Sequence, residues 1–468
     1  MRTETDFLGT VELPDDTPFG IHTFRAAGNF AFSAERIRPD LFAALIVVKK
    51  VAARANREAG LLDDRIANVI VFACDEILKD VVRYLSPLHP LQGGAGTSTN
   101  MAANELVANL ALRQLGLPFG RYEEISPLDH VNLSQSTNDT VPTALRIAVI
   151  GGLHRLHDAC ECLLDALQGK EHEFSRLLKV GRTELQDAMP LSLGQEFSAW
   201  AEGVSRFRWR LDKAVDWVRE VNLSGTAIGT GINADRGYAR AVIDLLRRET
   251  QEPLALARNL IDATANLDPL VEVSGLIRTG AVTVKKIAAD LRLLSSGPRC
   301  GFGEIRLPAQ QEGSSIMPGK VNPVMPEAVE QVCLAVIGGD AVIAIAAAES
   351  DLQLPQFFPL VAHTLLTNLE LLAGALRGLG RTVSGITADE ARLSALLDQS
   401  FAAATLLAPV IGHERVAELV SEARRTGEGV LALIRRRGIL DEARLARLLT
   451  PEIMAAPGMP LLEDDDGK

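Results

Sequence analysis

The residues with the clearest chemical potential stand together in one stretch, Gly313-Ser-Ser-Ile-Met-Pro-Gly-Lys-Val-Asn322. Two hydroxyl groups, an ammonium group and an amide lie there between glycines and prolines. A loop of this kind can close over a ligand, because its glycines absorb changes of backbone angle. It is not a phosphate-binding loop, since five residues separate Gly313 from Gly319 and Val321 stands where a magnesium-binding hydroxyl is needed. We interpret the stretch as a candidate catalytic loop.

Three further segments are rich in small hydrogen-bond donors. They read Gly94-Ala-Gly-Thr-Ser-Thr-Asn100, Ser134-Gln-Ser-Thr-Asn-Asp139 and Gly181-Arg-Thr-Glu-Leu-Gln-Asp187. A fourth, Gly229-Thr-Gly-Ile-Asn-Ala234, has the glycine spacing of a dinucleotide-binding turn. The strand–helix–strand setting that such a turn requires is missing, so we do not expect a nicotinamide site.

Taken in order along the chain, these segments resemble the sequence blocks of the aspartase/fumarase superfamily, whose loop follows the pattern GSSxMPxKxNP. Matches at 226–233 and 295–299 extend the resemblance from about Phe19 to the C-terminal region. The resemblance implies a lyase that performs anti elimination on a small dicarboxylate. It implies no cofactor, and we expect no metal site.

The difficult species in such an elimination is the dianion left when a carbon beside a carboxylate loses its proton. Preorganised donors must stabilise it. By resemblance, Ser314 is the base and Lys320 a catalytic cation. A serine hydroxyl is too weak a base unless backbone N–H groups and a nearby cation stabilise its ionised form. The resemblance implies these substrate-binding residues: Thr97, Ser136, Thr137, Asn138, Thr183, Glu184 and Asn322.

Glu184 is the position that bears on the leaving group. The resemblance places His there in fumarases and often Gln in aspartases. A carboxylate beside a dicarboxylate is repelled, or its pKa rises until it holds a proton, unless the substrate also carries a cation. Aspartate carries an ammonium group and malate does not, so Glu184 favours elimination of ammonia from L-aspartate to give fumarate. Glu184 could instead be protonated, or turn away to pair with Arg182.

Other interpretations stay open. The chain could be a fumarate hydratase or could act on another N-substituted aspartate, because Pro355 stands where the family usually has Asn. It could also be a catalytically silent homologue, although a scaffold has no need to keep Ser314, Lys320 and Asn322 together. The aspartase-like segments near the N-terminus, including Phe19-Gly-Ile-His-Thr-Phe-Arg25, favour the ammonia-lyase interpretation.

Composition and charge limit the kinds of binding partner and the cellular compartment that we expect. The net charge is −12 and no basic stripe is present, which argues against nucleic-acid binding. The five cysteines are scattered and the N-terminus lacks a signal-peptide core, so we expect a cytoplasmic protein. The most apolar window, residues 334–348, contains Gly338, Gly339 and Asp340. We interpret it as a buried helix rather than a membrane span.

The elements that must position these residues are mainly helices. Aromatic residues make up only 4% of the chain and hydrophobic residues 47%, a balance typical of closely packed helices. Apolar periodicity predicts helices over 38–84 with a break at Gly60, from Asn100 to Leu115, and over 153–178, 193–223 and 281–294. We expect extended chain or coil over the first forty residues and no strand–turn–strand segments.

The predicted fold is therefore mainly α, with three regions. A mixed N-terminal cap spans 1–138, a central bundle of long helices 139–390, and a small helical region with an acidic tail 391–468. The tail, Glu463-Asp-Asp-Asp466, has the composition of a disordered segment. The resemblance implies a homotetramer whose bundles form one helical core. Its active sites would be shared between subunits.

Overall fold

The computed structural model describes residues 1–456, and the predicted disordered tail lies outside them. The described chain is mainly helical, which confirms the predicted fold class. It divides into two compact units, each built from separate parts of the sequence. The first unit comprises Met1–His157, Trp209–Ala281 and Leu334–Ala373; the second comprises Asp158–Arg208, Val282–Cys333 and the chain from Gly374 onward.

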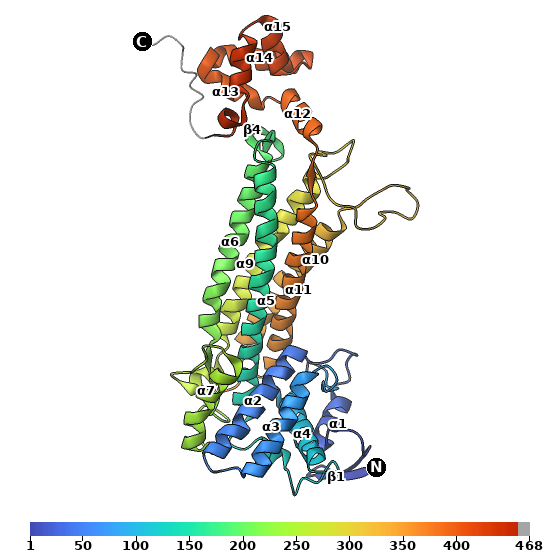
Figure 1. Cartoon of the computed structure of the whole chain (residues 1–468), viewed down its shortest axis with the longest axis vertical. Helices are drawn as coiled ribbons and strands as arrows, with labels where there is room; N and C mark the ends of the chain where they lie inside the picture. Colours follow the sequence, from blue (N-terminus) through green and yellow to red (C-terminus); the bar gives the residue numbers. More distant parts are fainter. Residues whose placement is uncertain (457–468) are drawn as a thin grey trace. The chain divides into compact units, whose positions relative to one another are not determined.

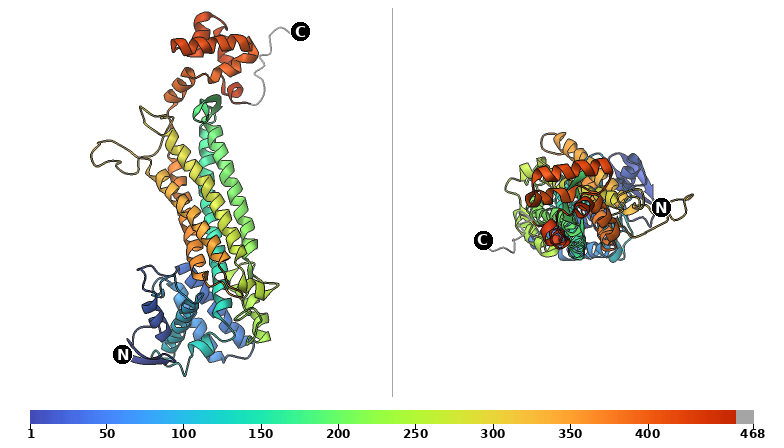
Figure 2. Two further views of the ribbon diagram at one scale, coloured as in Figure 1. Left: turned by 180° about the vertical axis from the view of Figure 1, so that it is seen from behind. Right: turned by 90° about the horizontal axis from the view of Figure 1, so that it is seen from above.

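Five long helices each contribute a stretch to both units, and within each unit these stretches lie side by side (Figures 1 and 2). They are α5 (Thr137–Glu173), α6 (Leu193–Val218), α9 (Asp268–Leu294), α10 (Val324–Ala348) and α11 (Phe358–Ser384). Glycines allow close approach: a Cβ on Gly152 would lie 2.8 Å from Leu369 in the first unit, and one on Gly380 would lie 3.1 Å from the Cys162 backbone in the second. The predicted long-helix bundle is confirmed.

The remaining elements of the first unit are short helices and strand pairs. They are β1 (Arg2–Asp6), β2 (Gly9–Leu13), α1 (Ile21–Asn29), α2 (Pro39–Glu58), α3 (Asp64–Lys79), α4 (Thr97–Gln114), η1 (Pro127–Val131), β5 (Glu220–Val221), α7 (Arg236–Thr250), β6 (Ala255–Leu256) and α8 (Leu260–Ala265). Helix α2 packs against α3, α4 and α7. The predicted break at Gly60 is confirmed, since this glycine separates α2 from α3 with φ of +73°.

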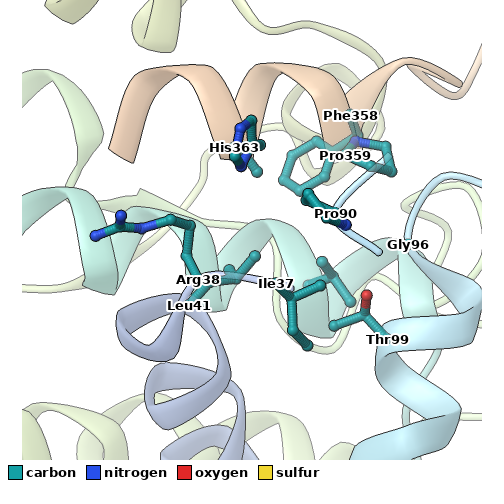
Figure 3. A pocket seen from close by; sticks show the side chains of 11 residues that line it. Ile37, Arg38, Leu41, Pro90, Gly96, Thr99, Phe358, Pro359 and His363 are labelled. Carbon is teal, nitrogen blue, oxygen red and sulfur yellow. The ribbon is translucent and has the colours of Figure 1, made fainter. Parts of the chain in front are cut away.

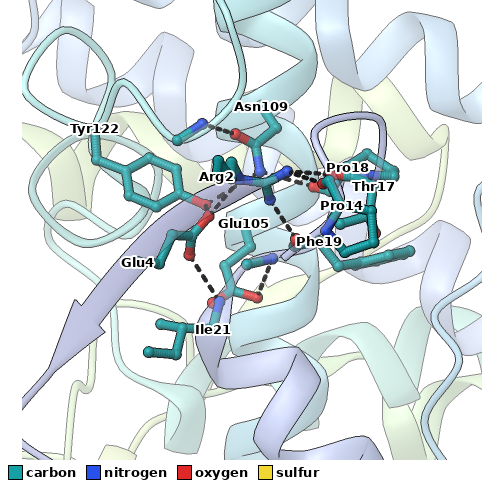
Figure 4. Close-up of polar contacts among 12 residues, drawn as sticks. Arg2, Glu4, Pro14, Thr17, Pro18, Phe19, Ile21, Glu105, Asn109 and Tyr122 are labelled. Atoms are coloured by element: carbon teal, nitrogen blue, oxygen red, sulfur yellow. Dashed lines mark hydrogen bonds and ion pairs between the residues drawn. The ribbon is translucent and has the colours of Figure 1, made fainter. Parts of the chain in front are cut away.

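Helix α1, which the sequence did not predict, begins over a buried carboxylate of α4 (Figure 4). Glu105 accepts hydrogen bonds from the backbone N–H groups of Gly20, His22 and Thr23 at 2.9–3.1 Å, and from the Thr23 hydroxyl at 2.5 Å. Burial raises the pKa of Glu105, and these donors oppose the rise. Helix α1 therefore starts where it does because a distant side chain satisfies its first free amides.

Replacing Glu105 by Ala should lower the free energy of unfolding by about 3 kcal/mol, because several buried donors lose their acceptor at once. Urea denaturation followed by circular dichroism measures the change. Glu123→Ala is the matched control, since that exposed carboxylate pairs with exposed Arg121 and its loss should change stability little. Equal losses in the two variants would contradict the capping role of Glu105.

The second unit holds the C-terminal helices and two strand pairs. Its further elements are β3 (Leu178–Thr183), β4 (Gln186–Ser192), β7 (Ile305–Arg306), β8 (Thr387–Ala388), α12 (Glu390–Gln399), α13 (Ala402–Ile411), α14 (His413–Thr426), α15 (Val430–Arg437), α16 (Glu442–Leu448) and α17 (Pro451–Met454). Leu419, Ile434 and Leu445 belong to one buried cluster that holds α14, α15 and α16 together. The β3–β4 hairpin contacts α12 and α13.

The expectation that strand–turn–strand segments are absent is wrong. Strands pair as β1–β2, β3–β4, β5–β6 and β7–β8, each in a sheet of two. The strands β5 to β8 have two residues each, too few to show the alternation of apolar and polar residues that marks a half-buried strand. The strands β3 and β4 are longer, but buried and exposed residues do not alternate regularly along them. Helix boundaries also differ at some ends: α6 stops at Val218 rather than at Leu223, and α4 begins at Thr97 rather than at Asn100.

Helix α10 is longer and less buried than expected. Its glycine pair and Asp340 do not interrupt it, because Asp340 is buried and bonded to α9: it accepts from the Ser274 hydroxyl at 2.6 Å and pairs with Arg278 at 2.7 Å. Leu334 and Ile345 are 55% and 64% exposed. By length and composition alone, α10 and α11 could each cross a membrane. The interpretation of residues 334–348 as a buried helix is therefore wrong for one face of α10.

Candidate active site

The 313–322 loop holds Ser314 in a turn that directs backbone N–H groups at its hydroxyl. The Ser314 Oγ accepts hydrogen bonds from the N–H of Ile316 at 3.2 Å and of Met317 at 3.0 Å. Two backbone donors stabilise negative charge on an oxygen. The arrangement supplies the backbone N–H groups that an ionised serine requires.

The two ends of the loop are bonded to each other. Gly313 N–H donates to Lys320 O at 2.8 Å, and the Asn322 amide donates to Gly313 O at 2.7 Å. A Cβ on Gly313 would lie 2.5 Å from Lys320 O, so no larger residue fits there. The Lys320 side chain is exposed, and Ser314 and Lys320 both line a cavity of about 620 Å³. The loop thus places a hydroxyl and a cation around one open space.

Thr183 and Glu184 stand at the tip of the β3–β4 hairpin. Thr183 pairs with Gln186, so the turn consists of Glu184 and Leu185, with φ of +53° and +61°. Two successive left-handed residues make the tight turn that joins twisted strands, a place usually taken by Asn and Gly. Glu184 and Leu185 are both exposed. Non-glycine residues held in this conformation are strained, and such strain concentrates at functional sites.

Arg182 forms an ion pair with Glu304 rather than with Glu184. Its guanidinium pairs with buried Glu304 at 2.6 Å and lies over the Phe302 ring at 4.2 Å. Lys179 pairs with the same Glu304 carboxylate at 2.7 Å. The interpretation in which Glu184 turns back to pair with Arg182 is therefore wrong, and the Glu184 carboxylate remains at the tip of an anchored hairpin.

The donors of the first unit gather at two helix starts. Thr97 is the first residue of α4 and Thr137 the first of α5, and Asn100, one turn into α4, donates to the Thr137 hydroxyl at 3.2 Å. Ser136 and Asn138 flank Thr137. Helix N-termini carry partial positive charge and free N–H groups, which favour a bound carboxylate. Two such ends with hydroxyl and amide donors suit one carboxylate of a small diacid.

A buried amide cluster that the sequence did not reveal supports this group. The Asn132 Oδ1 accepts from Asn100 and Asn104, both at 3.1 Å, and from Lys49 Nζ at 3.0 Å. Lys49 is fully buried, and that burial lowers its pKa to about 7. One signal was available: Lys49 follows the apolar run 41–48 and lies one helical turn after Leu45 and Ile46, on a face where a charged residue needs a buried partner.

Asp139 fixes the loop around the donors. Its carboxylate accepts from the N–H of Ser136 at 3.0 Å and of Thr226 at 2.9 Å. Burial raises the pKa of Asp139 to about 6, against these backbone donors and the charge of Lys49. Thr226 has φ of +57°, unusual for a β-branched residue, so the bond to Asp139 helps to hold a strained segment.

A small cavity lies beside this group (Figure 3). It has a volume of about 20 Å³, and its lining includes Gly96 and Thr99 on one side and Phe358, Pro359 and His363 on the other. Room for about one water remains. At this cavity the segment that follows Pro355 lies opposite the turn that precedes Thr97. The unusual proline is therefore close in sequence to residues that face the donor group.

The predicted site residues form two groups. The first unit holds Thr97, Ser136, Thr137 and Asn138 around two helix starts. The second unit holds Ser314, Lys320 and Asn322 in one loop and Thr183 and Glu184 on one hairpin. The first unit thus holds hydroxyl and amide donors at two helix starts, and the second holds a serine hydroxyl, a lysine ammonium group and an exposed carboxylate.

Comparisons with known proteins bear on the family of the chain. A family model described as lyase matches residues 9–338, and one described as fumarase C C-terminus matches residues 404–456. The aspartate ammonia-lyase of Pseudomonas fluorescens is 45% identical over 97% of this chain and 96% of its own length. That of Bacillus subtilis (strain 168) is 40% identical over 98% and 97%.

Two solved structures extend the likeness to the fold. A fumarate lyase:delta crystallin from Brucella melitensis, bound to cobalt, has a TM-score of 0.94 and 45% identity, covering 97% of this chain and all of that one (100%). A class II fumarase from Schistosoma mansoni has a TM-score of 0.90 and 30% identity, covering 97% and 99%.

Proposed function

Because the chain belongs to the aspartase/fumarase superfamily of lyases, we propose that it eliminates ammonia from L-aspartate to give fumarate. The observation that carries the chemistry is the pair of backbone N–H groups aimed at the Ser314 hydroxyl. Ionised Ser314 takes the proton from the carbon beside one carboxylate, and the carbon–nitrogen bond of the next carbon then breaks. Lys320 is the nearby cation that favours the ionised serine.

The remaining residues hold the substrate in this proposal. Thr97, Ser136, Thr137 and Asn138 bind one carboxylate at the two helix starts. Thr183 and Asn322 add donors, and Glu184 accepts a hydrogen bond from the ammonium group. Donors set around the carboxylate that gains charge stabilise the dianion more than the ground state, which is the condition for faster elimination.

The chain acts as a homotetramer in this proposal, with each active site drawn from different copies. The exposed side chains of Leu334 and Ile345 on α10 support a tetramer, because a soluble protein rarely leaves an apolar helix face of this length exposed to solvent. The paired, buried Asp340 favours protein neighbours over lipid around α10. The cytoplasm is the compartment that fits, and a small dicarboxylate is the only ligand that the proposed reaction requires.

The direct test is an assay of fumarate formation, which is monitored by the ultraviolet absorbance of fumarate near neutral pH. L-aspartate, L-malate and argininosuccinate are supplied in parallel reactions. We expect turnover of aspartate. Turnover of malate without aspartate would replace the proposal by a hydratase. A second candidate, elimination from another N-substituted aspartate, is favoured by Pro355, and turnover of argininosuccinate alone would support it. A stable tetramer inert toward all three would be a silent homologue.

Glu184 should discriminate the leaving group. Replacing it by Gln or His should lower kcat/KM for aspartate by about 10- to 100-fold, because a hydrogen bond between two charged groups is lost. Malate offers the internal control, since its hydroxyl does not need a carboxylate partner, and its turnover should not fall in parallel. Equal aspartate activity in the wild type and both variants would show that Glu184 does not contact the ammonium group.

A further inference from the structure

A buried cluster of charged groups lies behind the β3–β4 hairpin in the second unit. Its centre is Glu304, which has no exposed surface and stands directly before β7. The Glu304 carboxylate pairs with Lys179 at 2.7 Å and with Arg182 at 2.6 Å, and both cations belong to β3. Lys179 also pairs with Glu196 of α6. Two cations and two carboxylates therefore balance within the cluster.

The backbone of Glu304 is fixed by two helices. Its N–H donates to Leu294 O, at the end of α9, at 2.9 Å, and its carbonyl accepts from the Asp389 N–H, at the start of α12, at 2.9 Å. Arg392 of α12 donates to Phe302 O, two residues before Glu304, at 2.9 Å. The carboxylate therefore projects from a well-bonded support toward the hairpin.

The hairpin that this carboxylate holds is irregular. Lys179 and Arg182 are three positions apart, and in a regular strand their side chains would point to opposite faces. The register of β3 against β4 shifts between Val180 and Arg182. Such a shift increases the local twist, which allows both cations to reach one carboxylate. Beyond it lies the strained turn of Glu184 and Leu185.

Arg182 is the last anchored side chain before the tip of the hairpin. Residues 183–187 are exposed, and within residues 1–456 none of their side chains forms a hydrogen bond or ion pair. Breaking a buried ion pair is costly, because the remaining charge is left without compensation. The pair with Glu304 therefore resists movement of Arg182. Thr183 and Glu184 follow directly in the chain, so their places depend on it.

We propose that Glu304 is a positioning residue, which sets through Arg182 where Thr183 and Glu184 meet the substrate. This inference rests on the proposed function, because it takes those two side chains as substrate-binding groups. Glu304 itself is fully buried and touches neither the substrate nor the reacting atoms. Its charge acts on the reaction from behind the hairpin.

The kinetics of Glu304→Gln provide the first test, since this variant keeps the shape of the side chain and removes its charge. We expect the KM for aspartate to rise about tenfold and kcat to fall less than about threefold, because the displaced groups are substrate contacts. A merely structural role would lower the amount of folded enzyme, which reduces the apparent kcat and leaves KM unchanged. Arg306→Ala is the matched control with wild-type constants, because it removes an exposed ion pair with Asp389 from the same segment.

A second variant covers the case in which Glu304→Gln does not fold. Arg182→Met leaves the Lys179–Glu304 pair in place and should raise the KM by a similar factor. A sharper test uses a protein that already carries Thr183→Val and Glu184→Gln. There, Glu304→Gln should change kcat/KM less than about twofold, because the groups that it positions are gone. An effect as large as in the wild type, or an unchanged KM in both Glu304→Gln and Arg182→Met, would overturn the positioning role.

Hydrogen exchange gives a result that does not depend on turnover. Backbone amides of residues 182–187 should exchange at least about tenfold faster in Glu304→Gln than in the wild type, whereas those of α14 to α16 should not change. Equal protection of the hairpin in both proteins, or faster exchange throughout the unit, would contradict the inference. Turnover of malate without aspartate would remove the proposed function, and the exchange rates would still decide whether Glu304 holds the hairpin.

Discussion

Replacing Ser314 by Ala should lower kcat for aspartate by about 10³-fold, with KM little changed. A positioned general base contributes about 10²- to 10⁴-fold, and alanine leaves nothing at that point to take the proton. The donors at the helix starts and the rest of the loop remain, so the substrate still binds. Steady-state rates of fumarate formation give both constants, and stopped assays extend the range to the residual rate.

Two controls keep this result interpretable. Ser394→Ala, at an exposed position of α12 in the same unit, should have wild-type kinetics. The thermal midpoint of Ser314→Ala should match that of the wild type, because its hydroxyl only accepts bonds within an exposed loop. If Ser314→Ala kept more than roughly a tenth of wild-type kcat, a base would have to be sought elsewhere.

A mixture of two inactive variants should regain activity. Thr137→Val removes a donor from the first unit, which should cost about 10²- to 10³-fold, and Ser314→Ala removes the base from the second. If each active site draws these residues from different copies, random co-assembly of equal amounts leaves about one quarter of the sites intact. Co-expression with two different affinity tags, followed by tandem purification, supplies the mixed assembly for the fumarate assay.

The assembly itself provides the control for this experiment. Sedimentation equilibrium should give four chains for the wild type and for each variant alone. Native mass spectrometry of the tandem-purified sample should show both variants in one particle. Mixed tetramers with no more activity than the separate variants would mean that Thr137 and Ser314 serve each site from a single chain, and a monomeric wild type would remove the assembly proposal.

Much of the fold followed from local sequence. Helical periodicity is strong when apolar residues recur over many turns, so the long helices and the break at Gly60 could be predicted. The two-stranded pairs could not, because their register depends on a partner and on a turn such as Glu184-Leu185, which contains neither Gly nor Asn. Helix α1 was missed for a related reason, since its cap is Glu105, 85 positions from Gly20.

The candidate site was predictable where its residues form compact blocks. The block around Thr137 brings hydroxyl and amide donors to the starts of α4 and α5, and the 313–322 loop directs two backbone N–H groups at Ser314. Lys49, Asn132 and Asp139 were not found, because their importance comes from burial and from partners on other elements. Spacing along the chain carries no information about such contacts.

The interleaving of the two units constrains how the protein can be made. The first unit includes residues up to Ala373, and the second has already begun at Asp158. When a ribosome has synthesised the first 157 residues, the core of the first unit is therefore incomplete. It can be completed only after more than half of the remaining chain has also been synthesised. Late closure of distant segments slows folding and prolongs exposure of apolar surface. The emerging chain thus has a long interval in which a chaperone is useful.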